Sequence, residues 1–337
     1  MNISVLGIDI GKNKLHFYGV TDEGEKAFRK KLNREKVIEF VATLEPCLIA
    51  MEACGGAHYW ARRFQEYGHQ VKLIPPQYVK MYVKTNKNDY NDAEAICEAV
   101  GRPRMRFVAV KTQEQSAWQL LHRFRQQAVE QRTALANQIR GALLEEGIAI
   151  PQGIGKLRAQ LPRVLEDAEN GLHDLTRSLI HDHSKQLKAL DERISDYDDQ
   201  IQELADNDDI CRLLVTIPGI GPLIATALKA AVGDPTHFRS GRHLSAWLGL
   251  VPRQNSTGDR TVLLGISKRG NCYVRTLLIH GARAVMHCLK DKDDRCKKWV
   301  DQLNGRSHQN IAAVGLANKI ARIAWVVMTR REAYKAA

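Results

Sequence analysis

Asp89 and Asp92 lie three residues apart at the start of a segment with helical periodicity, "NKNDYNDAEAI". Residues three or four apart share one face of a helix, so both carboxylates extend the apolar stripe of Ala93, Ile96 and Val100. One interpretation is structural, with Asp89 capping the helix and Asp92 stabilised by its positive N-terminal end. The other is a metal site, which needs carboxylates from elsewhere in the chain.

Two further carboxylates, Asp9 and Glu52, stand at the ends of apolar runs that predict strands. If these strands are neighbours, the two side chains lie side by side. Asp9 then shares a strand face with Val5, where an unpaired charge would be costly. Repulsion among four carboxylates is relieved by hard divalent cations that prefer oxygen ligands, such as Mg²⁺ or Mn²⁺. Two such ions about 4 Å apart can bind the attacking and leaving oxygens of a phosphodiester.

The segments around these carboxylates predict a mixed α/β domain with helices packed on a sheet. Two strands in "ISVLGIDIGKNKLHFYGV" are joined by a turn at residues 11–13, and a third follows in "EKAFRKKL". Then come a helix in "NREKVIEFVATL", a strand in "CLIAMEA", a helix in "HYWARRFQEYG" and a strand in "QVKLI". The helix that carries Asp89 and Asp92 follows them.

The stretch "GIDIGKNK" also fits the first phosphate-binding loop of actin-like and sugar-kinase ATPases. Those folds need a second glycine-rich phosphate loop further along the chain. The segment "ACGGAHYW" is too short for that role and lacks the preceding acid at the right spacing. The sequence therefore favours the metal site over an ATPase.

The middle of the chain predicts two long helices. Residues 113–146 have apolar or small side chains at spacings of three and four, with no proline. The second helix, within residues 184–207, has the spacing of a coiled-coil seam at Leu187, Leu190, Ile194, Tyr197, Ile201 and Leu204. A helical hairpin or dimerisation arm and a pair of helices packed within one chain both fit, because fewer than four heptads are present. Residues 151–167 between them are predicted to be connecting structure.

The segment "LLVTIPGIGPLIATALKAAVGD" resembles a helix-hairpin-helix motif, with Gly219 and Gly221 in the turn. Backbone N–H groups at such a turn can bind a nucleic-acid phosphate without reading its sequence. A purely structural turn between two helices is the alternative.

Downstream, Ser256 and Thr257 are predicted in a polar loop. The surrounding positive charge suits a hydroxyl that attacks phosphorus, although a serine in such a loop is also an ordinary turn residue. That charge comes from Lys268, Arg269, Arg275 and Arg283.

The charge balance of the chain is the one expected of a nucleic-acid binder, although basic charge alone does not establish that role. The 337 residues include 50 Lys and Arg against 38 Asp and Glu, a net charge of +12. Lys84 and Lys87 form a basic stretch before the Asp89 helix, and we predict that they bind DNA or RNA together with Lys268, Arg269 and Arg275. The seven cysteines are scattered without a Cys-x-x-Cys pair, which predicts reduced thiols and no zinc site. No targeting segment and no run of about 18 apolar residues is evident, so a cytoplasmic protein without membrane insertion is expected.

Five motifs together resemble the DEDD transposases of bacterial insertion sequences: the insertion sequence one hundred and ten family, especially its eleven-eleven subgroup, with the pilin-gene invertases as relatives. They occur in the family's order from Val5 to about Val327: "GIDIGKNKLHFYGV", "MEACGGAHYWAR", "KNDYNDAEAI", "IPGIGPLIATAL" and "GLVPRQNSTGDRTVLLGISKRGN".

The resemblance implies two domains: a RuvC-like, ribonuclease-H-fold domain, expected at 1–110, and a mainly α C-terminal transposase domain, expected at 209–337. The two long helices predicted between them make 111–208 a helical coiled-coil region, expected to serve oligomerisation. Carried over by position, the DEDD set is Asp9, Glu52, Asp89 and Asp92, and Ser256 is the nucleophile. Some relatives have the serine immediately before the glycine, where this chain has Thr257.

The resemblance further implies a DNA recombinase that cuts and rejoins donor and target DNA through a covalent phosphoserine. A structured guide RNA and a homo-oligomer, dimer or tetramer, are the expected partners, and the active site could be composite between subunits. The alternative is a metal-dependent hydrolytic Holliday-junction resolvase or nuclease, in which the carboxylates activate water. A catalytically silent nucleic-acid scaffold is a third possibility, which would tolerate neutralisation of Asp9 or Asp92.

Overall fold

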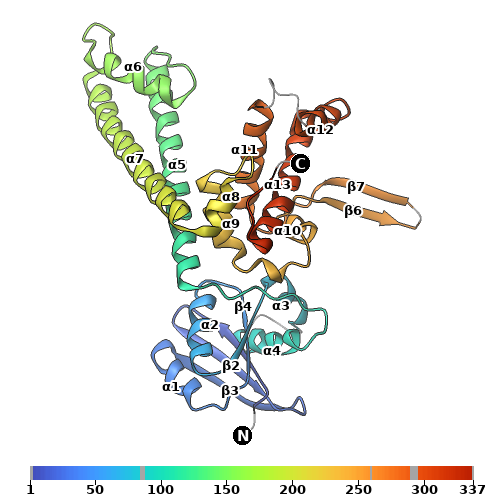
Figure 1. The fold of residues 1–337 in the computed structure, drawn as a ribbon. Coiled ribbons are helices and arrows are strands. Elements are labelled where there is room, and N and C mark those ends of the chain that lie inside the picture. The colour runs from blue at the N-terminus through green and yellow to red at the C-terminus, as the bar shows by residue number, and fades with distance from the viewer. Residues whose placement is uncertain (1–2, 84–87, 259, 289–294, 336–337) are drawn as a thin grey trace. The chain divides into compact units, whose positions relative to one another are not determined.

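The computed structural model describes residues 3–83, 88–258, 260–288 and 295–335 (Figure 1). The chain divides into two compact units, Met1–Ser116 and Ala117–Ala337. The basic residues Lys84 and Lys87 lie outside the described residues, so their predicted role stays a prediction.

The first unit is built on a five-stranded sheet with the order β3-β2-β1-β4-β5. Strands β1, β2 and β3 form an antiparallel meander, and β4 and β5 continue the sheet parallel to β1. The mixed α/β prediction is confirmed. The strands are β1 (Val5–Ile10), β2 (Lys14–Val20), β3 (Lys26–Asn33), β4 (Leu48–Glu52) and β5 (Gln70–Ile74).

Helices cover both faces of this sheet. On one face, Leu6 and Ile8 of β1 share a core with side chains of α1 (Val37–Ala42) and α2 (Ala57–Glu66). On the other face, Val5 of β1 and Ala50 of β4 pack with α4 (Asp89–Val100). Short turns of helix complete the unit: η1 (Arg34–Lys36), α3 (Pro76–Val79) and η2 (Lys80–Tyr82).

Gly7 allows α4 to lie directly on β1. A Cβ atom at this position would come within 2.3 Å of the Ala93 carbonyl oxygen and 2.7 Å of the Cys97 sulfur. The Cys97 thiol also hydrogen-bonds to the backbone carbonyl of Tyr18, the residue paired with Gly7 across β1 and β2. Only a residue without a side chain fits this close approach, and it sets how near the start of α4 comes to the end of β1.

The second unit has a helical body and a long helical hairpin. The body has one apolar core formed by side chains of its helices and of the base of the hairpin. Its elements are α8 (Asp209–Val215), α9 (Pro222–Val232), η3 (Pro235–His237), α10 (Gly241–Trp247), α11 (Cys272–Cys288), α12 (Arg295–Asn304) and α13 (Gln309–Arg330). Within the described chain α13 alone is long and apolar enough to span a membrane by length and composition. Its apolar residues are part of the core of the body, which explains that composition.

The hairpin consists of α5 (Gln113–Glu145) and α7 (Asp174–Asn207), with α6 (Ile154–Glu166) at its far end (Figure 1). The prediction of connecting structure for residues 151–167 is wrong for most of that range, because Leu157 and Leu161 give α6 a buried face in the core at the end of the hairpin.

The predicted seam of α7 is used within the chain. Leu187, Ile194 and Ile201 are buried, whereas the alternate seam positions stay half-buried. Bonds from Arg125 to Asp198 (2.5 Å) and from Arg132 to Asp191 (3.3 Å) tie α5 to α7. Two helices packed within one chain therefore account for the spacing without a partner.

A two-stranded ribbon extends from the helical body (Figure 1). It is formed by β6 (Pro252–Thr257) and β7 (Arg260–Ile266), which pair antiparallel. Every residue of β6 is exposed, and only two residues of β7 are half-buried. The prediction of a loop at Ser256 and Thr257 is wrong, because both residues lie in β6. An isolated ribbon has solvent on both faces, so polar side chains can alternate along its strands.

Candidate functional site

Asp9 and Glu52 come from adjacent parallel strands. The register of β1 and β4 pairs Ile8 with Met51, and the next residue on each strand is a carboxylate. Alternation along the strands places both carboxylates on the face covered by α4, because Ile8 and Met51 face the opposite core. The prediction that Asp9 shares a face with Val5 agrees with this arrangement.

Asp89 and Asp92 occupy the first turn of α4. The side chain of Asn88 caps the helix by accepting a hydrogen bond from the Tyr90 backbone N–H at 3.0 Å, so Asp89 is not the cap that the structural interpretation assumed. Asp92 is half-buried, whereas the Asp89 side chain is 60% exposed. Of the two, Asp92 is the one directed further into the protein.

Burial and neighbouring negative charges raise the pKa values of both strand carboxylates. Burial raises the pKa of Asp9 to about 6, and the negative charges of Asp92, Asp89 and Glu52 add to the rise. Burial also raises the pKa of Glu52, with a further contribution from Asp92. Carboxylates in mutual repulsion favour either a proton or a cation between them.

His16 belongs to this cluster although it is not among the site residues predicted from the sequence. It pairs with Asp9 across β1 and β2, and its Nδ1 atom lies 4.0 Å from an Asp9 oxygen and 3.6 Å from an Asp89 oxygen. The ring is almost fully buried, Nδ1 has no hydrogen-bond partner in the described structure, and burial lowers the pKa of His16. Burial therefore favours the neutral imidazole, which does not offset the negative charge of the carboxylates.

Cys54, two residues after Glu52, borders the same cluster. Burial raises the pKa of its thiol, and the charges of Glu52 and Asp9 raise it further. The thiolate, not the thiol, is the metal-binding form of cysteine, so the raised pKa makes Cys54 a weaker candidate ligand. The carboxylates and the imidazole of His16 remain as donors around the site, and a hard cation such as Mg²⁺ prefers the carboxylate oxygens.

The donor atoms fit a hard divalent cation, because all four acidic side chains offer oxygen. Across residues 3–83, 88–258, 260–288 and 295–335, no three His, Cys, Asp or Glu side chains are close enough together to hold a metal ion. The carboxylates of this cluster would have to rotate inward to close around a cation.

Ser256 lies in the exposed ribbon of the second unit. The Gln254 side-chain N–H donates a hydrogen bond to Ser256 Oγ at 2.8 Å, because the two residues share one face of β6. Ser256 pairs with Thr261 across the ribbon, and Thr257 pairs with Arg260. Thr257 therefore faces the opposite side from Ser256.

The basic residues predicted to bind nucleic acid differ in their exposure. Lys268 and Arg269 are exposed in the turn that follows β7. Arg275 is 6% exposed, and its guanidinium donates to the backbone carbonyls of Leu248 (3.0 Å) and Arg269 (2.8 Å). Arg275 therefore stabilises the turn from inside, which argues against a direct contact with phosphate.

The two glycines of the helix-hairpin-helix candidate also differ. Gly219 has a φ of 88°, and a Cβ there would come within 2.7 Å of a Val285 methyl and 3.0 Å of the Gly281 carbonyl oxygen. The turn at Gly219 packs against α11, which favours a purely structural turn over a phosphate-binding one at this position. Gly221 precedes α9 and has open space around it.

Comparison with known protein families gives two matches. A family model described as "Transposase", of the DEDD type, matches residues 6–147. A second, described as "Transposase IS116/IS110/IS902 family", matches residues 211–297. The first match contains the four carboxylates and the second contains Ser256.

Curated relatives match the chain from end to end. The chain is 46% identical over 336 residues to a probable family 20 transposase of Pseudomonas aeruginosa, with 99% of each chain covered. It is 43% identical over 334 residues to the transposase for insertion sequence element IS1111A of Coxiella burnetii, covering 99% of this chain and 92% of the relative. The transposase for insertion sequence element IS1328 of Yersinia enterocolitica is 43% identical over 331 residues, with 98% of each covered.

Proposed function

Because the chain belongs to the IS110 family of insertion-sequence transposases, enzymes that act on DNA, we propose that it cuts and rejoins DNA with a metal-binding carboxylate site and a serine nucleophile. A DEDD transposase domain implies dependence on divalent metal in general. Mg²⁺ is the proposed ion, with Mn²⁺ as a substitute, and Asp9, Glu52, Asp89 and Asp92 are its proposed ligands.

One observation carries the metal assignment: Asp9 and Glu52 directly follow the paired residues of two adjacent parallel strands, on the sheet face that α4 covers. Asp9 thus has three other carboxylates near it, and their charges add to the rise of its pKa. Two of these come from α4 and one from β4, so the sheet and the helix together concentrate negative charge on one face. The metal would stabilise charge on the phosphorus, while the chain holds the oxygen ligands and supplies buried surroundings at Asp9.

A RuvC-like, ribonuclease-H-type fold is proposed for the first unit. The support is its topology, in which a three-stranded antiparallel meander continues into two parallel strands with helices on both faces. In this arrangement the central strand β1 ends with one carboxylate, and its parallel neighbour ends with a second.

Ser256 is proposed to attack a DNA phosphorus and to form a phosphoserine linkage, with the 3′ or 5′ oxygen of the cut strand as leaving group. The serine hydroxyl loses its proton in this step, and the bond energy of the phosphodiester is kept for rejoining. The hydrogen bond from Gln254 to Ser256 Oγ supports this role, since it orients the oxygen and leaves the hydroxyl hydrogen available to a base.

A structured guide RNA, a dimer or tetramer and a cytoplasmic location are further proposals. The net charge of +12 suits binding of more than one nucleic-acid strand. An oligomer would allow Ser256 of one subunit to complete the carboxylate site of another. Mixing Ser256→Ala subunits with Asp9→Ala subunits tests this, because restored cutting requires assembly between chains and its absence argues against it.

The central experiment incubates the purified protein, its element RNA and Mg²⁺ with an end-labelled DNA junction. Products are resolved on a denaturing gel for the wild type, Ser256→Ala and Thr257→Ala. We expect a covalent protein–DNA adduct that Ser256→Ala lowers by at least about 10⁴-fold, the scale of nucleophile removal, and that Thr257→Ala retains.

The same gel separates the leading proposal from hydrolysis. Cut DNA without an adduct in any variant would identify a nuclease or resolvase in which the carboxylates activate water. Activity that persists in both Ser256→Ala and Asp92→Asn would contradict the assignment of both groups. Thermal melting of each variant establishes that lost activity does not reflect unfolding.

A further inference from the structure

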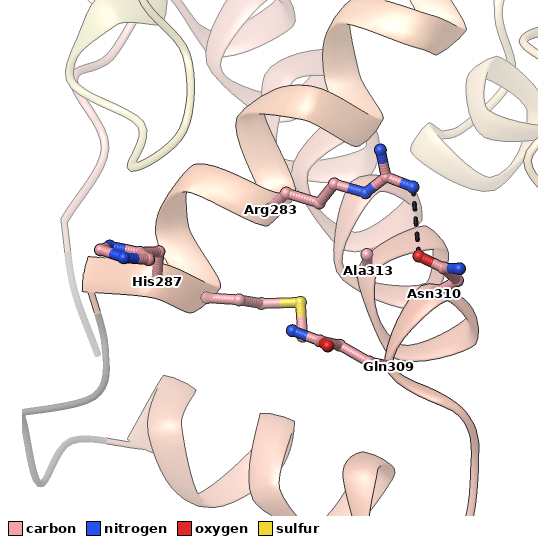
Figure 2. Close-up of a pocket in the computed structure, with 6 residues that line it drawn as sticks. Arg283, His287, Gln309, Asn310 and Ala313 are labelled. Atoms are coloured by element: carbon pink, nitrogen blue, oxygen red, sulfur yellow. Dashed lines mark hydrogen bonds between the residues drawn. The ribbon is translucent and has the colours of Figure 1, made fainter. Parts of the chain in front are cut away.

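A small cavity of about 260 Å³ lies between α11 and α13 in the second unit (Figure 2). It is smaller than the roughly 300–1,000 Å³ typical of pockets that enclose a whole small molecule. The space therefore suits one chemical group of a larger ligand. Its lining residues are Arg283, Met286, His287, Gln309, Asn310 and Ala313.

The polar side chains of this cavity are hydrogen-bond donors, and none of the lining residues is acidic. Arg283 and His287 project from α11, and Gln309 and Asn310 from the start of α13 (Figure 2). Arg283 is exposed and has no carboxylate partner among the residues that the structure describes. A guanidinium beside two carboxamides favours an anionic oxygen ligand.

One hydrogen bond fixes the orientation of these donors. The Arg283 guanidinium donates to Asn310 Oδ1 at 3.1 Å. The bond occupies one lone pair of Asn310 Oδ1 and leaves the N–H₂ group of the carboxamide to donate, together with the remaining N–H groups of Arg283. The two side chains thus present donors from two helices to the same space.

The floor of the cavity is rigid. Met286 and Ala313 are buried at 9% and 1% exposure and belong to the apolar core of the helical body. The donors therefore stand on two helices that are packed against each other, which lowers the entropy cost of holding a ligand. The N-terminal backbone of α13 does not add a free donor at Asn310, because the His308 side chain accepts from that N–H.

We propose that this notch binds one phosphate of the DNA backbone, outside the carboxylate and serine groups. About half to two-thirds of protein–DNA hydrogen bonds go to phosphate and sugar, and Arg, Asn and Gln are common donors. The contact would position the DNA without reading its sequence. This inference rests only on the DNA-binding part of the proposed function and is independent of metal and of Ser256.

The test is equilibrium binding of labelled duplex DNA by fluorescence anisotropy, in EDTA, across a series of NaCl concentrations. Loss of one phosphate contact should reduce the slope of log K against log salt by about 0.9 for duplex DNA. We expect this reduction and a several-fold weaker Kd for Arg283→Gln. For Gln309→Ala we expect a smaller loss of affinity with an unchanged slope, because the glutamine is uncharged.

The matched control is Arg212→Gln, which removes an exposed arginine of α8 whose charge is already paired with Asp209. If Arg283→Gln and Arg212→Gln have the same slope and affinity, the proposal is wrong. It is equally wrong if Arg283→Gln weakens only the binding of RNA. Because the assay contains no divalent metal and needs no cutting, failure of the carboxylate or serine chemistry would leave its result unchanged.

Discussion

The carboxylate cluster and the serine ribbon are held in opposite ways. Asp9 and Glu52 end central strands of a five-stranded sheet, and α4 is packed against that sheet at Gly7. Ser256 lies on two strands that pair only with each other and whose side chains are mostly exposed. An isolated two-stranded ribbon is at best marginally stable in water.

This difference matches the demands of the two groups. Carboxylates that repel one another must be held together by the fold, so their position depends on tight packing behind them. Ser256, the proposed nucleophile, would need an accessible position more than a buried one to reach a DNA strand. The proposed metal ligands thus stand on a tightly packed part of the fold, and the proposed nucleophile stands on an exposed one.

The largest effect is expected from adding a side chain at one glycine in each region, Gly7 of the sheet and Gly265 of the ribbon. Gly7→Val should lower the free energy of unfolding of the first unit by about 4 kcal/mol, because its Cβ would overlap the Ala93 carbonyl and Cys97. Gly265→Val in β7 should change it by less than about 0.5 kcal/mol, since no atom lies within 4 Å of a Cβ there. Chemical denaturation measures both variants, and equal losses would contradict the contrast between the regions.

A smaller effect is expected from removing the charge of Asp9. Burial and the neighbouring carboxylates raise the pKa of this side chain from its ordinary value of 3.8 to about 6 in the folded protein. The unfolded chain therefore releases its proton at lower pH than the folded protein, and stability falls as pH rises from about 4 to about 6. Above that range the ionised Asp9 costs up to about 3 kcal/mol in the metal-free protein.

Asp9→Asn should remove this fall and raise the melting temperature at pH 7.5 in EDTA, while abolishing DNA cutting. Melting curves between pH 4 and 8 measure it. Mg²⁺ should stabilise the wild type more than the variant, because binding to the folded state adds to its stability. A wild type whose stability does not fall across pH 4–6 would contradict the close grouping of the carboxylates.

The smallest effect is expected within the ribbon. Gln254→Ala should reduce the rate of adduct formation by about tenfold, the value of one hydrogen bond of about 1.4 kcal/mol, and leave the melting temperature unchanged. Asn255→Ala is the control, since it is the neighbouring polar residue on the opposite face of β6. Equal rates in both variants would show that Gln254 does not orient Ser256.

Strand alternation and helix periodicity predict most of the first unit. The face of Asp9 follows from period two along β1, and the meander follows from its turns. His16 is not predicted as a site residue because its position opposite Asp9 depends on the register between β1 and β2. The sequence does hold a signal for that register: only three residues separate Ile10 from Lys14, and such a tight hairpin places His16 opposite Asp9. The N-terminus of α4 lies one residue earlier than the capping interpretation assumed. Asn88 is therefore the capping residue, and Asp89 belongs to the first turn of the helix.

The second unit is harder to predict because its side chains are positioned by distant segments. Nothing local distinguishes the buried Arg275 from the exposed Arg269; the difference arises from the Leu248 carbonyl 27 residues earlier. The close packing of the turn at Gly219 likewise depends on a distant residue, Gly281 of α11. The sequence predicts a loop where the structure has the ribbon, because the polar residues of β6 are also common in turns. The ribbon also lacks the buried apolar residues whose alternation would indicate a strand.

The helical hairpin sets a length. At about 1.5 Å per residue, the 33 residues of α5 extend about 50 Å, which equals the rise of about 15 base pairs of DNA. The core around α6 keeps the end of this rod folded, so removing four residues from both α5 and α7 would bring that end about 6 Å closer to the helical body without altering its surface. The number of helical turns in α5 and α7 thus determines how far the end of the hairpin lies from the helical body.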